Sequence, residues 1–421
     1  MKAAYTTLGC KVNQYDTDAM RELMEKAGYE TVDFSETADV YIINTCTVTN
    51  IADRKSRQMI RRAVDANKEA VVCVTGCLAQ REAENVKHIE GVDAVLGVNN
   101  RHQIVEIVGR ALEQRGIYDV EDISVDRQYE RLSISGSERT RAHIKIEDGC
   151  DNFCSYCIIP YTRGRIRSRS MDDILKEAGT LAKNGVKEIV VTGIHISSYG
   201  KDIGGVGLID VITMLGDING IERIRLGSLE PTVLSDEFCS AAAGVEKLCP
   251  HFHVSLQSGC DSVLKRMNRH YTAEEYYGYI QNLRKYFVDP AVTTDVIAGF
   301  NKETPEEHET TIEFLKRINF ARVHVFPFSE RKGTAAVKMG GALPLSVRKQ
   351  RAQELISVCC RMQEEYAASF IGTTVKVLFE ETKDGFAYGY TERYVRVRGK
   401  AEANEMKEVF IRDIEGDTLI S

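Results

Sequence analysis

The sequence of 421 residues contains no tryptophan, only 7 prolines and no long apolar run. A helix that spans a bilayer needs about 20 consecutive, mostly apolar residues, so no transmembrane helix is predicted. The first residues, MKAAYTTLGCKVNQYD, become polar before the apolar core of a signal peptide could form. We therefore expect a cytoplasmic protein that makes no membrane contact.

The sequence also lacks an excess of positive charge. It has 55 Lys and Arg against 62 Asp and Glu, which gives a formal net charge of −7. Broad, charge-driven attraction to nucleic acid is therefore not expected. A local basic patch remains compatible with this balance, because phosphate contact needs only a few well-placed Lys or Arg. Composition leaves RNA binding open.

Residues 1–114 alternate short apolar runs with amphipathic stretches. The apolar runs, expected to form buried strands, cover residues 2–7, 40–44, 70–75 and 94–97. The stretches with helical spacing cover residues 15–27, 51–66 and 103–114. This βαβ order predicts an α/β domain with a doubly wound parallel sheet. The polar residues 115–141, which show no clear period, are expected to be a linker.

Residues 142–347 contain a second βα series. Its six expected strands cover residues 143–147, 188–192, 223–227, 251–256, 292–297 and 322–326. The five expected helices between them cover residues 171–184, 208–218, 236–243, 274–286 and 305–319. Six strands with helices between them predict a partial (βα)6 barrel rather than the eight units of a complete barrel.

The chain ends with one expected helix and a set of short β-runs. Residues 348–370 are predicted to form a connecting helix. Residues 371–421 contain TTVKVLFEE, GFAYGY, TERYVRVRGK and MKEVFIRDIEG, with turns between them. Short strands separated by turns favour a small C-terminal β-barrel.

Twelve cysteines in a chain without an export signal are more often metal ligands or catalytic groups than disulfides. Cys150, Cys154 and Cys157 lie within eight residues, directly after the expected strand 143–147, where such barrels place their chemistry. A [4Fe–4S] cluster takes four ligands, so three cysteines leave one iron open for a small molecule. A structural zinc site is the alternative, but such sites usually contain two CxxC pairs, and the sequence has no second pair.

A second cysteine group is dispersed along the first domain. Cys10, Cys46 and Cys77 each follow an expected strand, and the carboxyl ends of parallel strands meet at one edge of a sheet. Gly9 and Gly76 precede two of them and give the backbone freedom to turn toward a cluster. Each cysteine alone is compatible with a buried core thiol. Together they predict the ligands of a second cluster.

Several longer motifs carry a resemblance to a known family. They are LGCKVNQYD, NTCTVT, TGCLAQ, GCDNFCSYCIIPYTRGRIRSR, SLQSGCDSVLKRMNR and TTDVIAGF. With them the whole chain resembles the methylthiotransferase family of radical S-adenosylmethionine enzymes. LGCKVN and NTCTVT are similar to the branch that modifies N6-threonylcarbamoyladenosine at tRNA position 37. The tail resembles the RNA-binding TRAM domain of that family. One departure is Asn301-Lys302, where the family commonly has Pro-Gly.

The resemblance implies two [4Fe–4S] clusters and S-adenosylmethionine as cofactors. The cluster on Cys150, Cys154 and Cys157 would cleave S-adenosylmethionine to a radical that removes hydrogen from C2 of the adenine. The cluster on the other three cysteines would present the sulfur that becomes the methylthio group. The implied partners are tRNA, an external electron donor and a sulfur donor that the sequence does not identify.

Two further groups are candidates for contacts with the cofactor and the RNA. At the ends of successive barrel strands, the candidates for binding S-adenosylmethionine are Gly193, Glu230, Gln257 and Asp295. His253 is interpreted as a core or rim histidine. The alternating Arg163, Arg165, Arg167 and Arg169 would share one face of an extended segment, where they are expected to bind a phosphate or the threonyl carboxylate. The tail candidates for RNA binding are Arg393, Arg396 and Arg398, with Tyr390 and Tyr394 as stacking rings.

Two alternatives remain open from the sequence. The substrate could be another tRNA adenosine or a ribosomal protein side chain, with the same enzyme class. The chain could also be an iron–sulfur protein that binds RNA without catalysis, in which case it would not cleave S-adenosylmethionine.

Overall fold

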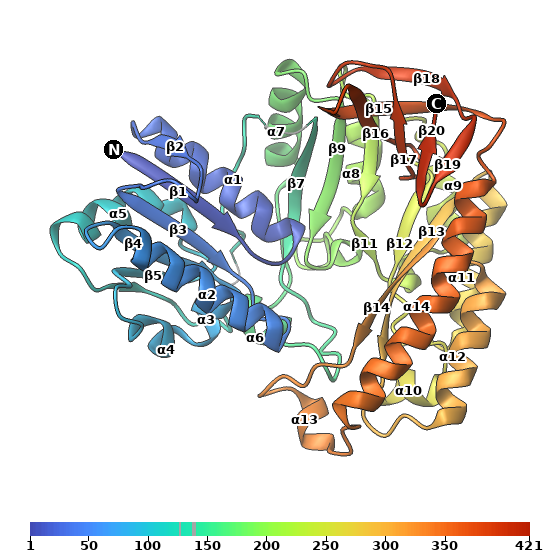
Figure 1. Cartoon of the computed structure of the whole chain (residues 1–421), viewed down its shortest axis with the longest axis horizontal. Helices are drawn as coiled ribbons and strands as arrows, with labels where there is room; N and C mark the ends of the chain where they lie inside the picture. The colour runs from blue at the N-terminus through green and yellow to red at the C-terminus, as the bar shows by residue number, and fades with distance from the viewer. Residues whose placement is uncertain (126–127, 137–139) are drawn as a thin grey trace.

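The computed structural model describes residues 1–125, 128–136 and 140–421. Three parts follow one another along the chain (Figure 1). An N-terminal α/β domain lies on one side of a central partial barrel, and a C-terminal β-domain covers one end of that barrel. The fold class predicted from the sequence is confirmed.

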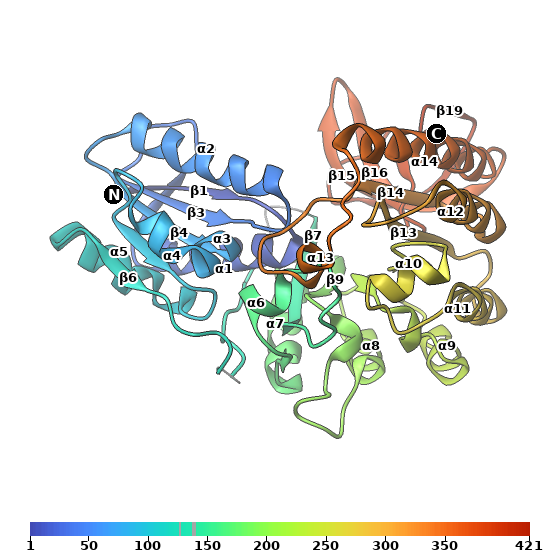
Figure 2. The same ribbon diagram turned by 90° about the horizontal axis from the view of Figure 1, so that it is seen from below.

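The N-terminal domain is a parallel sheet of six strands in the order β2-β1-β3-β4-β5-β6. The strands are β1 (Lys2–Thr7), β2 (Glu30–Val32), β3 (Val40–Thr45), β4 (Val71–Gly76), β5 (Ala94–Leu96) and β6 (Ile117–Asp119). The helices are α1 (Lys11–Lys26), α2 (Asn50–Ala66), α3 (Cys77–Arg81), α4 (Ala83–Lys87) and α5 (Ile104–Glu113). One apolar core lies under α1 and α5, and a second under α2, α3 and α4. Helices therefore cover both faces, as Figure 2 shows for α2 and α5.

Two edge strands and part of the expected linker differ from the prediction. β2 and β6 have only three residues each, and neither carries the apolar pattern that marks the four central strands. β6 pairs with β5, so the N-terminal sheet continues past residue 114. Glu130, Leu132 and Ile134 are buried, so this part of the expected linker packs against the domains. Positions 126–127 and 137–139 of that linker lie outside the described residues.

The central barrel contains six parallel main strands, as predicted. They are β7 (Arg141–Asp148), β9 (Glu188–Gly193), β10 (Arg223–Leu226), β12 (His251–Val254), β13 (Ala291–Ala298) and β14 (Arg322–Pro327). The helices outside them are α7 (Met171–Lys183), α8 (Leu208–Gly216), α9 (Asp236–Ala243), α11 (Ala273–Tyr286) and α12 (Pro305–Ile318). A bridge between Ile224 and Leu248 joins the two halves of the curved sheet.

Short elements that the sequence did not predict connect these units. They are α6 (Ile159–Arg163), β8 (Arg167–Ser168), β11 (Ser228–Leu229), α10 (Asp261–Arg266), α13 (Ala335–Met339) and three 3-10 turns at Arg101–Gln103, Ile196–Ser198 and Pro231–Val233. Most lie at the carboxyl ends of barrel strands, where they shape the loops of the site described below.

The alternation of side chains along the barrel strands makes the barrel interior polar. On β7, Ala142, Ile144 and Ile146 belong to the large core beneath the helices. Successive side chains on a strand point to opposite faces, so Lys145 and Glu147 point into the barrel. The same alternation places the charged groups of β9, β10, β12 and β14 inside. The barrel therefore encloses a polar interior rather than an apolar core.

The chain leaves the barrel through α14 (Leu345–Ala368), which packs along β14 (Figure 1). The C-terminal sheet has the order β18-β15-β16-β17-β20-β19. Its strands are β15 (Thr374–Lys383), β16 (Phe386–Thr391), β17 (Arg396–Gly399), β18 (Met406–Phe410), β19 (Asp413–Glu415) and β20 (Thr418–Ile420). Its small core contains Val377, Phe379, Val397 and Leu419.

The two tyrosines expected to stack on RNA instead face the barrel. The rings of Tyr390 and Tyr394 stack on each other with centroids 4.6 Å apart. The guanidinium of Arg141 lies 5.1 Å from both rings, and that of Arg225 lies 4.8 Å from Tyr394. His251 packs against the same ring at 5.1 Å. These ring contacts are made to barrel side chains, and the stacking role predicted for the two tyrosines stays a prediction.

The turn at Asn301-Lys302 forms without the Pro-Gly of the family. Asn301 is fully buried, and its side-chain amide donates to the carbonyl of Ala336 at 2.6 Å. Lys302 has φ of +59°, in the left-handed region where glycine is favoured. Its N–H donates to the carbonyl of Gly341 at 2.8 Å. The buried amide and this backbone bond hold the turn in place.

Candidate active site

The three clustered cysteines occupy the loop between β7 and α6. The N–H of Cys157 donates to the carbonyl of Cys154 at 2.9 Å, which closes a turn around the second and third cysteines. The N–H of Asn152 lies 3.5 Å from the Cys150 sulfur. The loop thus winds back on itself at the carboxyl end of the first barrel strand, as predicted.

A segment far along the chain anchors this loop. The N–H of Ser155 donates to the carbonyl of Met267, and the Asn268 side chain donates to the carbonyl of Phe153. Arg269 places one guanidinium nitrogen 3.2 Å from the Cys154 sulfur and another 2.7 Å from the Glu230 carboxylate. The motif SVLKRMNR therefore positions the cysteine loop.

The sulfur atoms of this loop interact electrostatically. Burial raises the pKa of Cys150 and of Cys157 to about 12, and the neighbouring sulfurs add to the effect. Within the residues that the structure describes, no three His, Cys, Asp or Glu side chains are arranged to hold a single metal ion. In a four-iron cluster each thiolate binds a different iron, so the cysteines surround a volume rather than one point. Three soft thiol donors around one loop fit such a cluster with one open iron.

The second group of cysteines comes together at the carboxyl edge of the N-terminal sheet. Cys10 precedes α1, Cys46 follows β3, and Cys77 begins α3 directly after β4. Burial raises the pKa of Cys46 to about 12, and the sulfurs of Cys77 and Cys10 raise it further, so the three lie within electrostatic reach. Their role as cluster ligands stays a prediction.

Two glycines make this approach possible. Gly9 has φ of +103°, and a Cβ atom there would lie 2.8 Å from the Cys46 sulfur. Gly76 has φ of +92°, and a Cβ atom there would collide with the Thr45 backbone. Both positions need a residue without a side chain, as the sequence predicted.

Arg163 joins the two cysteine groups and is fully buried. Its Nε donates to the Cys77 sulfur at 3.4 Å, and its Nη1 pairs with Asp148 at 2.8 Å, two residues before Cys150. Its Nη2 contacts Asn13 and Asp16 on α1. The prediction that Arg163 lies on an exposed strand face is wrong, because it ends helix α6 and carboxylates from two domains enclose it.

The other members of the arginine run also differ from the predicted common face. Arg167 is buried and donates to the carbonyl groups of Arg163 and Arg165. Arg169 is buried in an ion pair with Glu177. Arg165 alone remains half-exposed, where it pairs with Asp151 at 3.4 Å and covers the Phe153 ring. Only Arg165 keeps the access that contact with an RNA phosphate requires.

The four candidates for S-adenosylmethionine contact lie at the carboxyl ends of barrel strands. Glu230 accepts from Arg269 and lies 3.5 Å from His195, which in turn contacts Asn152 of the cysteine loop. Gly193 packs against Glu147, where a Cβ atom would lie 3.0 Å from the carboxylate. These contacts connect the strand ends to the cysteine loop.

The remaining two candidates lie on the far side of the barrel. Gln257 has φ of +70°, and its backbone pairs with both Asp295 and Ile297. Asp295 lies 3.3 Å from His253. His253 in turn shares a hydrogen bond of 3.0 Å with Thr293. Whether these side chains hold the cofactor stays a prediction.

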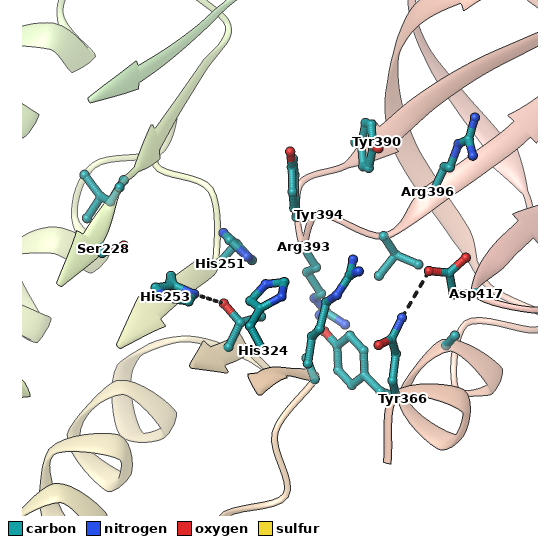
Figure 3. A pocket seen from close by; sticks show the side chains of 18 of the residues that line it. Ser228, His251, His253, His324, Tyr366, Tyr390, Arg393, Tyr394, Arg396 and Asp417 are labelled. Atoms are coloured by element: carbon teal, nitrogen blue, oxygen red, sulfur yellow. Dashed lines mark hydrogen bonds between the residues drawn. The ribbon is translucent and has the colours of Figure 1, made fainter. Parts of the chain in front are cut away.

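A chamber of about 520 Å³ lies beside these strands (Figure 3). Its walls come from four parts of the chain: α1, the inner face of the barrel, α14 and the C-terminal domain. Burial, with Arg225, lowers the pKa of His251 well below its ordinary value, so this imidazole is neutral. The side chain of Lys11 is exposed to the chamber, although much of its surroundings is protein. The resulting loss of solvation, together with the positive charges of Arg141 and Arg225, lowers the pKa of Lys11 to about 8.

The tail arginines predicted to bind RNA all lie beside carboxylates. Arg393 pairs with Asp289 at 2.6 Å, Arg396 lies 3.5 Å from Glu381, and Arg398 pairs with Glu415 at 2.8 Å. Their side chains keep between 28% and 41% of their exposure. A phosphate would reach them by displacing these acidic partners.

Sequence reasoning missed the residues that connect the loops. Arg269, His195, Lys11 and His251 were not singled out, because their partners are remote in sequence. One local signal was present: His251 and His253 alternate in HFHV, which places both on one face of the strand. Their place in a polar barrel interior follows only once the apolar residues are assigned to the outside.

Two family models match this chain. The one described as "Uncharacterized protein family UPF0004" matches residues 2–97, and the "Radical SAM superfamily" matches residues 144–315. The described part of the chain contains no helix that is both long and apolar enough to cross a membrane.

The chain is similar to several curated tRNA-modifying proteins. "Threonylcarbamoyladenosine tRNA methylthiotransferase MtaB" of Bacillus subtilis is 42% identical over 94% of this chain and 89% of its own length. MtaB of Aquifex aeolicus is 37% identical over 98% and 100%. "tRNA-2-methylthio-N(6)-dimethylallyladenosine synthase" of Acetivibrio thermocellus is 36% identical over 94% and 85%.

The fold is also similar to that of a solved structure. The radical S-adenosylmethionine methyltransferase TsrM from Kitasatospora setae, with tryptophan and a cofactor analogue bound, aligns with a TM-score of 0.58. The alignment covers 80% of this chain and 75% of that one, with 16% identical residues. At this identity the likeness concerns the fold alone.

Proposed function

Because this chain belongs to the methylthiotransferase family of radical S-adenosylmethionine enzymes, we propose that it methylthiolates C2 of N6-threonylcarbamoyladenosine at tRNA position 37. One observation carries this proposal: Arg163 connects the loops of the two cysteine triplets. The chain in which this occurs is 42% identical to an enzyme named for that reaction. The substrate is tRNA, and the protein is a transferase.

The cofactors are S-adenosylmethionine and two [4Fe–4S] clusters. Cys150, Cys154 and Cys157 would hold the first cluster, and Cys10, Cys46 and Cys77 the second. When bound, these groups supply a radical that removes hydrogen from carbon and a sulfur that replaces it. An inert C–H bond on a base needs chemistry of this kind, because acid–base groups cannot break it.

The residues around the first triplet orient the loop and the cofactor. Arg269 fixes Cys154 and Glu230 relative to each other, and His195 connects Glu230 to Asn152. S-adenosylmethionine would lie across the carboxyl ends of the strands, in contact with Gly193, Glu230, Gln257 and Asp295. The support for this assignment is that all four positions adjoin the cysteine loop or the opposite rim of the barrel.

Arg163 holds the two cysteine loops in a fixed relation. Its guanidinium is fully buried, so water is excluded from the protein between the loops. Burial alone would lower its pKa, but Asp148 and the neighbouring groups raise the pKa well above its ordinary value, which keeps the charge in place. The guanidinium also places a positive charge beside the Cys77 sulfur.

RNA binding would rest on the half-exposed arginines. Arg165 lies beside the cysteine loop, and Arg393, Arg396 and Arg398 lie on the C-terminal domain. Electrons would come from an external donor and sulfur from a donor that is not part of this chain. With these partners, the reaction would take place in the cytoplasm.

A second candidate is methylthiolation of an adenosine that carries a dimethylallyl group on N6. It is supported by the 36% identity to the enzyme of Acetivibrio thermocellus that is named for that nucleoside. The two candidates share the cofactors and differ in the group on N6 of the adenine. That group is anionic in the first case and apolar in the second.

Mass spectrometry of tRNA nucleosides tests the proposal. A strain without the gene should lose the methylthio form of threonylcarbamoyladenosine and accumulate its precursor, and the gene on a plasmid should restore it. Loss of a methylthiolated dimethylallyladenosine instead would favour the second candidate. An unchanged nucleoside profile would contradict both.

A further inference from the structure

The chamber beside the barrel strands contains positive groups that have no hydrogen-bond or ion-pair partner in the part of the chain that the structure describes. Within the described residues, neither the Lys11 ammonium nor the Arg322 guanidinium takes part in a hydrogen bond or an ion pair, and both line the chamber. The other cations around the chamber differ in this respect. Arg393 and Arg396 contact carboxylates, and Arg141 pairs with Glu380.

Two histidines add uncharged donors and acceptors to the same wall. His251 is buried, with an exposed fraction of 7%, and its Nδ1 has no hydrogen-bond partner among the described residues. His324 lies on the neighbouring inner face of β14, with its ring 5.9 Å from that of His253 (Figure 3). A buried imidazole nitrogen without a partner is unfavourable unless a ligand or water satisfies it.

Within the described residues, no acidic group on the chamber forms an ion pair with Lys11 or Arg322. Asp417 lines the wall and accepts a hydrogen bond from Gln363 at 3.1 Å. Asp295 lies behind His253 at 3.3 Å. The chamber therefore presents two free cations and a free imidazole nitrogen among the described residues, which together suit an anion with additional polar groups.

The position of the chamber connects it to both cysteine groups. Lys11 directly follows Cys10, the first cysteine of the second triplet. His253 and Thr293 lie on the inner face of the barrel and share a hydrogen bond. His253 also lies 3.3 Å from Asp295, a candidate for cofactor contact. β14 pairs only with β13 among the described strands, so the sheet is open on the side where Arg322 lies. A group attached to an adenine between the two triplets could extend into this chamber.

We infer that the chamber binds the threonylcarbamoyl group of the substrate, with Lys11 and Arg322 holding its carboxylate and His251 and His324 contacting its other polar atoms. This inference rests on the proposed function. Lys11 and Arg322 are then residues that determine specificity. A dimethylallyl group would leave both cations and the imidazole unpaired, and a site with unpaired polar groups rejects such an analogue.

A backbone phosphate is the other anion that tRNA could offer. The carboxylate is favoured because α1, the inner face of the barrel, α14 and the C-terminal domain wall the chamber, whose volume of about 520 Å³ holds a nucleoside substituent with room to spare. The half-exposed arginines on the surface are better placed for the RNA backbone. The two sources are distinguished by comparing RNAs that differ only at N6.

The test uses the cluster-loaded full-length protein and anticodon stem-loop RNAs that carry threonylcarbamoyladenosine, dimethylallyladenosine or unmodified adenosine at position 37. The affinity of the protein for each RNA is measured under anaerobic conditions. The wild-type protein should prefer the threonylcarbamoyl RNA over the unmodified RNA. Lys11→Met should reduce affinity for the threonylcarbamoyl RNA about tenfold, as loss of a hydrogen bond to a charged group does, and leave the unmodified RNA unaffected. Lys11→Arg should retain most of the preference.

Lys26→Met is the matched control, because Lys26 lies on the same helix and pairs with Glu22 at the surface. It should change neither affinity. Iron content per chain shows whether Lys11→Met still loads both clusters. If Lys11→Met does not load both clusters, the affinities of Arg322→Met test the inference instead. Arg322 lies far in sequence from all six cysteines, and its replacement should give a smaller loss of affinity for the threonylcarbamoyl RNA.

Three outcomes would overturn the inference: an unchanged preference in Lys11→Met and Arg322→Met, an equal loss for all three RNAs, or no wild-type preference. An equal loss would identify a phosphate site. The proposed function is judged separately, by product formation. A wild-type protein that prefers the threonylcarbamoyl RNA but yields no methylthio product would contradict the function and leave the anion site in place.

Discussion

The Nε atom of Arg163 lies 3.4 Å from the Sγ atom of Cys77, although the two residues belong to different domains. The same guanidinium pairs with Asp148, just before the other cysteine loop. One buried side chain thus connects the loops that carry the two triplets. The relation between the two cofactor sites is therefore set by the fold, and we expect it to be sensitive to this residue.

Arg163→Met should separate the two halves of the reaction. The variant leaves the buried Asp148 carboxylate without its closest partner, which should lower the free energy of unfolding by about 3 kcal/mol. Iron bound by the second triplet should fall, and methylthio product should fall more than 5′-deoxyadenosine. Iron content and both products are measured on one preparation. Arg110→Met is the control, since its exposed pair with Glu106 contributes little. Equal product yields in both variants would contradict this role.

Stability should depend on pH through Glu130. Burial by itself would raise the pKa of this carboxyl, but Arg101, His102 and Lys145 together outweigh burial and lower the pKa from 4.5 to about 2. A depressed folded-state pKa stabilises the protein above pH 4.5, and this contribution is lost as the pH falls toward 2. Glu130→Gln should therefore cost about 3 kcal/mol at pH 7 and progressively less below about pH 5. Denaturant unfolding across this range measures it, with exposed Glu364→Gln as control. A difference that stays constant with pH would show that the ion pair is not its source.

Lys302→Gly should stabilise the protein. Lys302 adopts φ of +59°, which costs a residue with a side chain about 1 kcal/mol relative to glycine. The same change at Lys349, which lies in the regular helix α14, should destabilise by about 1 kcal/mol. Thermal unfolding of the two variants compares them directly. A destabilised Lys302→Gly variant would mean that the packing of the lysine stem on Gly341 outweighs the backbone strain.

Removing three tail cations should weaken tRNA binding and flatten its dependence on salt. The net charge of −7 makes long-range attraction weak, so binding rests on local cations. Each phosphate that an arginine neutralises adds about one to the slope of log affinity against log salt. Changing Arg393, Arg396 and Arg398 to Ala should therefore reduce that slope, by less than three in total because each arginine already lies beside a carboxylate. Identical slopes for both proteins would place RNA capture elsewhere.

Much of the fold follows from local patterns in the sequence. The four central strands of the first sheet and the six main barrel strands were predictable, because each is a short apolar or alternating run with a helical stretch after it. The edge strands β2 and β6 were not, since ETV and IYD lack the fully apolar, buried character that marks the equally short β5. The cysteine loop was also predictable, because its three cysteines are adjacent in sequence.

The arginine run shows where local reasoning fails. The alternation of Arg163, Arg165 and Arg167 is typical of an exposed strand, yet the first residue ends a helix and the third is buried. The carboxylates that surround Arg163 come from α1 and from the end of β7, at distances of 147 and 15 residues along the chain, respectively. The cationic neighbours of Tyr390 and Tyr394 likewise belong to the barrel and could not be predicted. Such pairs exist only once the domains are packed together.

The most direct test of the account compares the two cysteine triplets in one anaerobic assay with tRNA. Mass spectrometry measures methylthiolated threonylcarbamoyladenosine and 5′-deoxyadenosine for three proteins. The wild type should form both products. Changing Cys150, Cys154 and Cys157 to Ala should abolish both and leave about half of the iron.

Changing Cys10, Cys46 and Cys77 to Ala should leave 5′-deoxyadenosine and abolish the methylthio product. Formation of methylthiolated tRNA at the wild-type rate by this second variant would contradict the account, because the first domain would then carry no sulfur-presenting site.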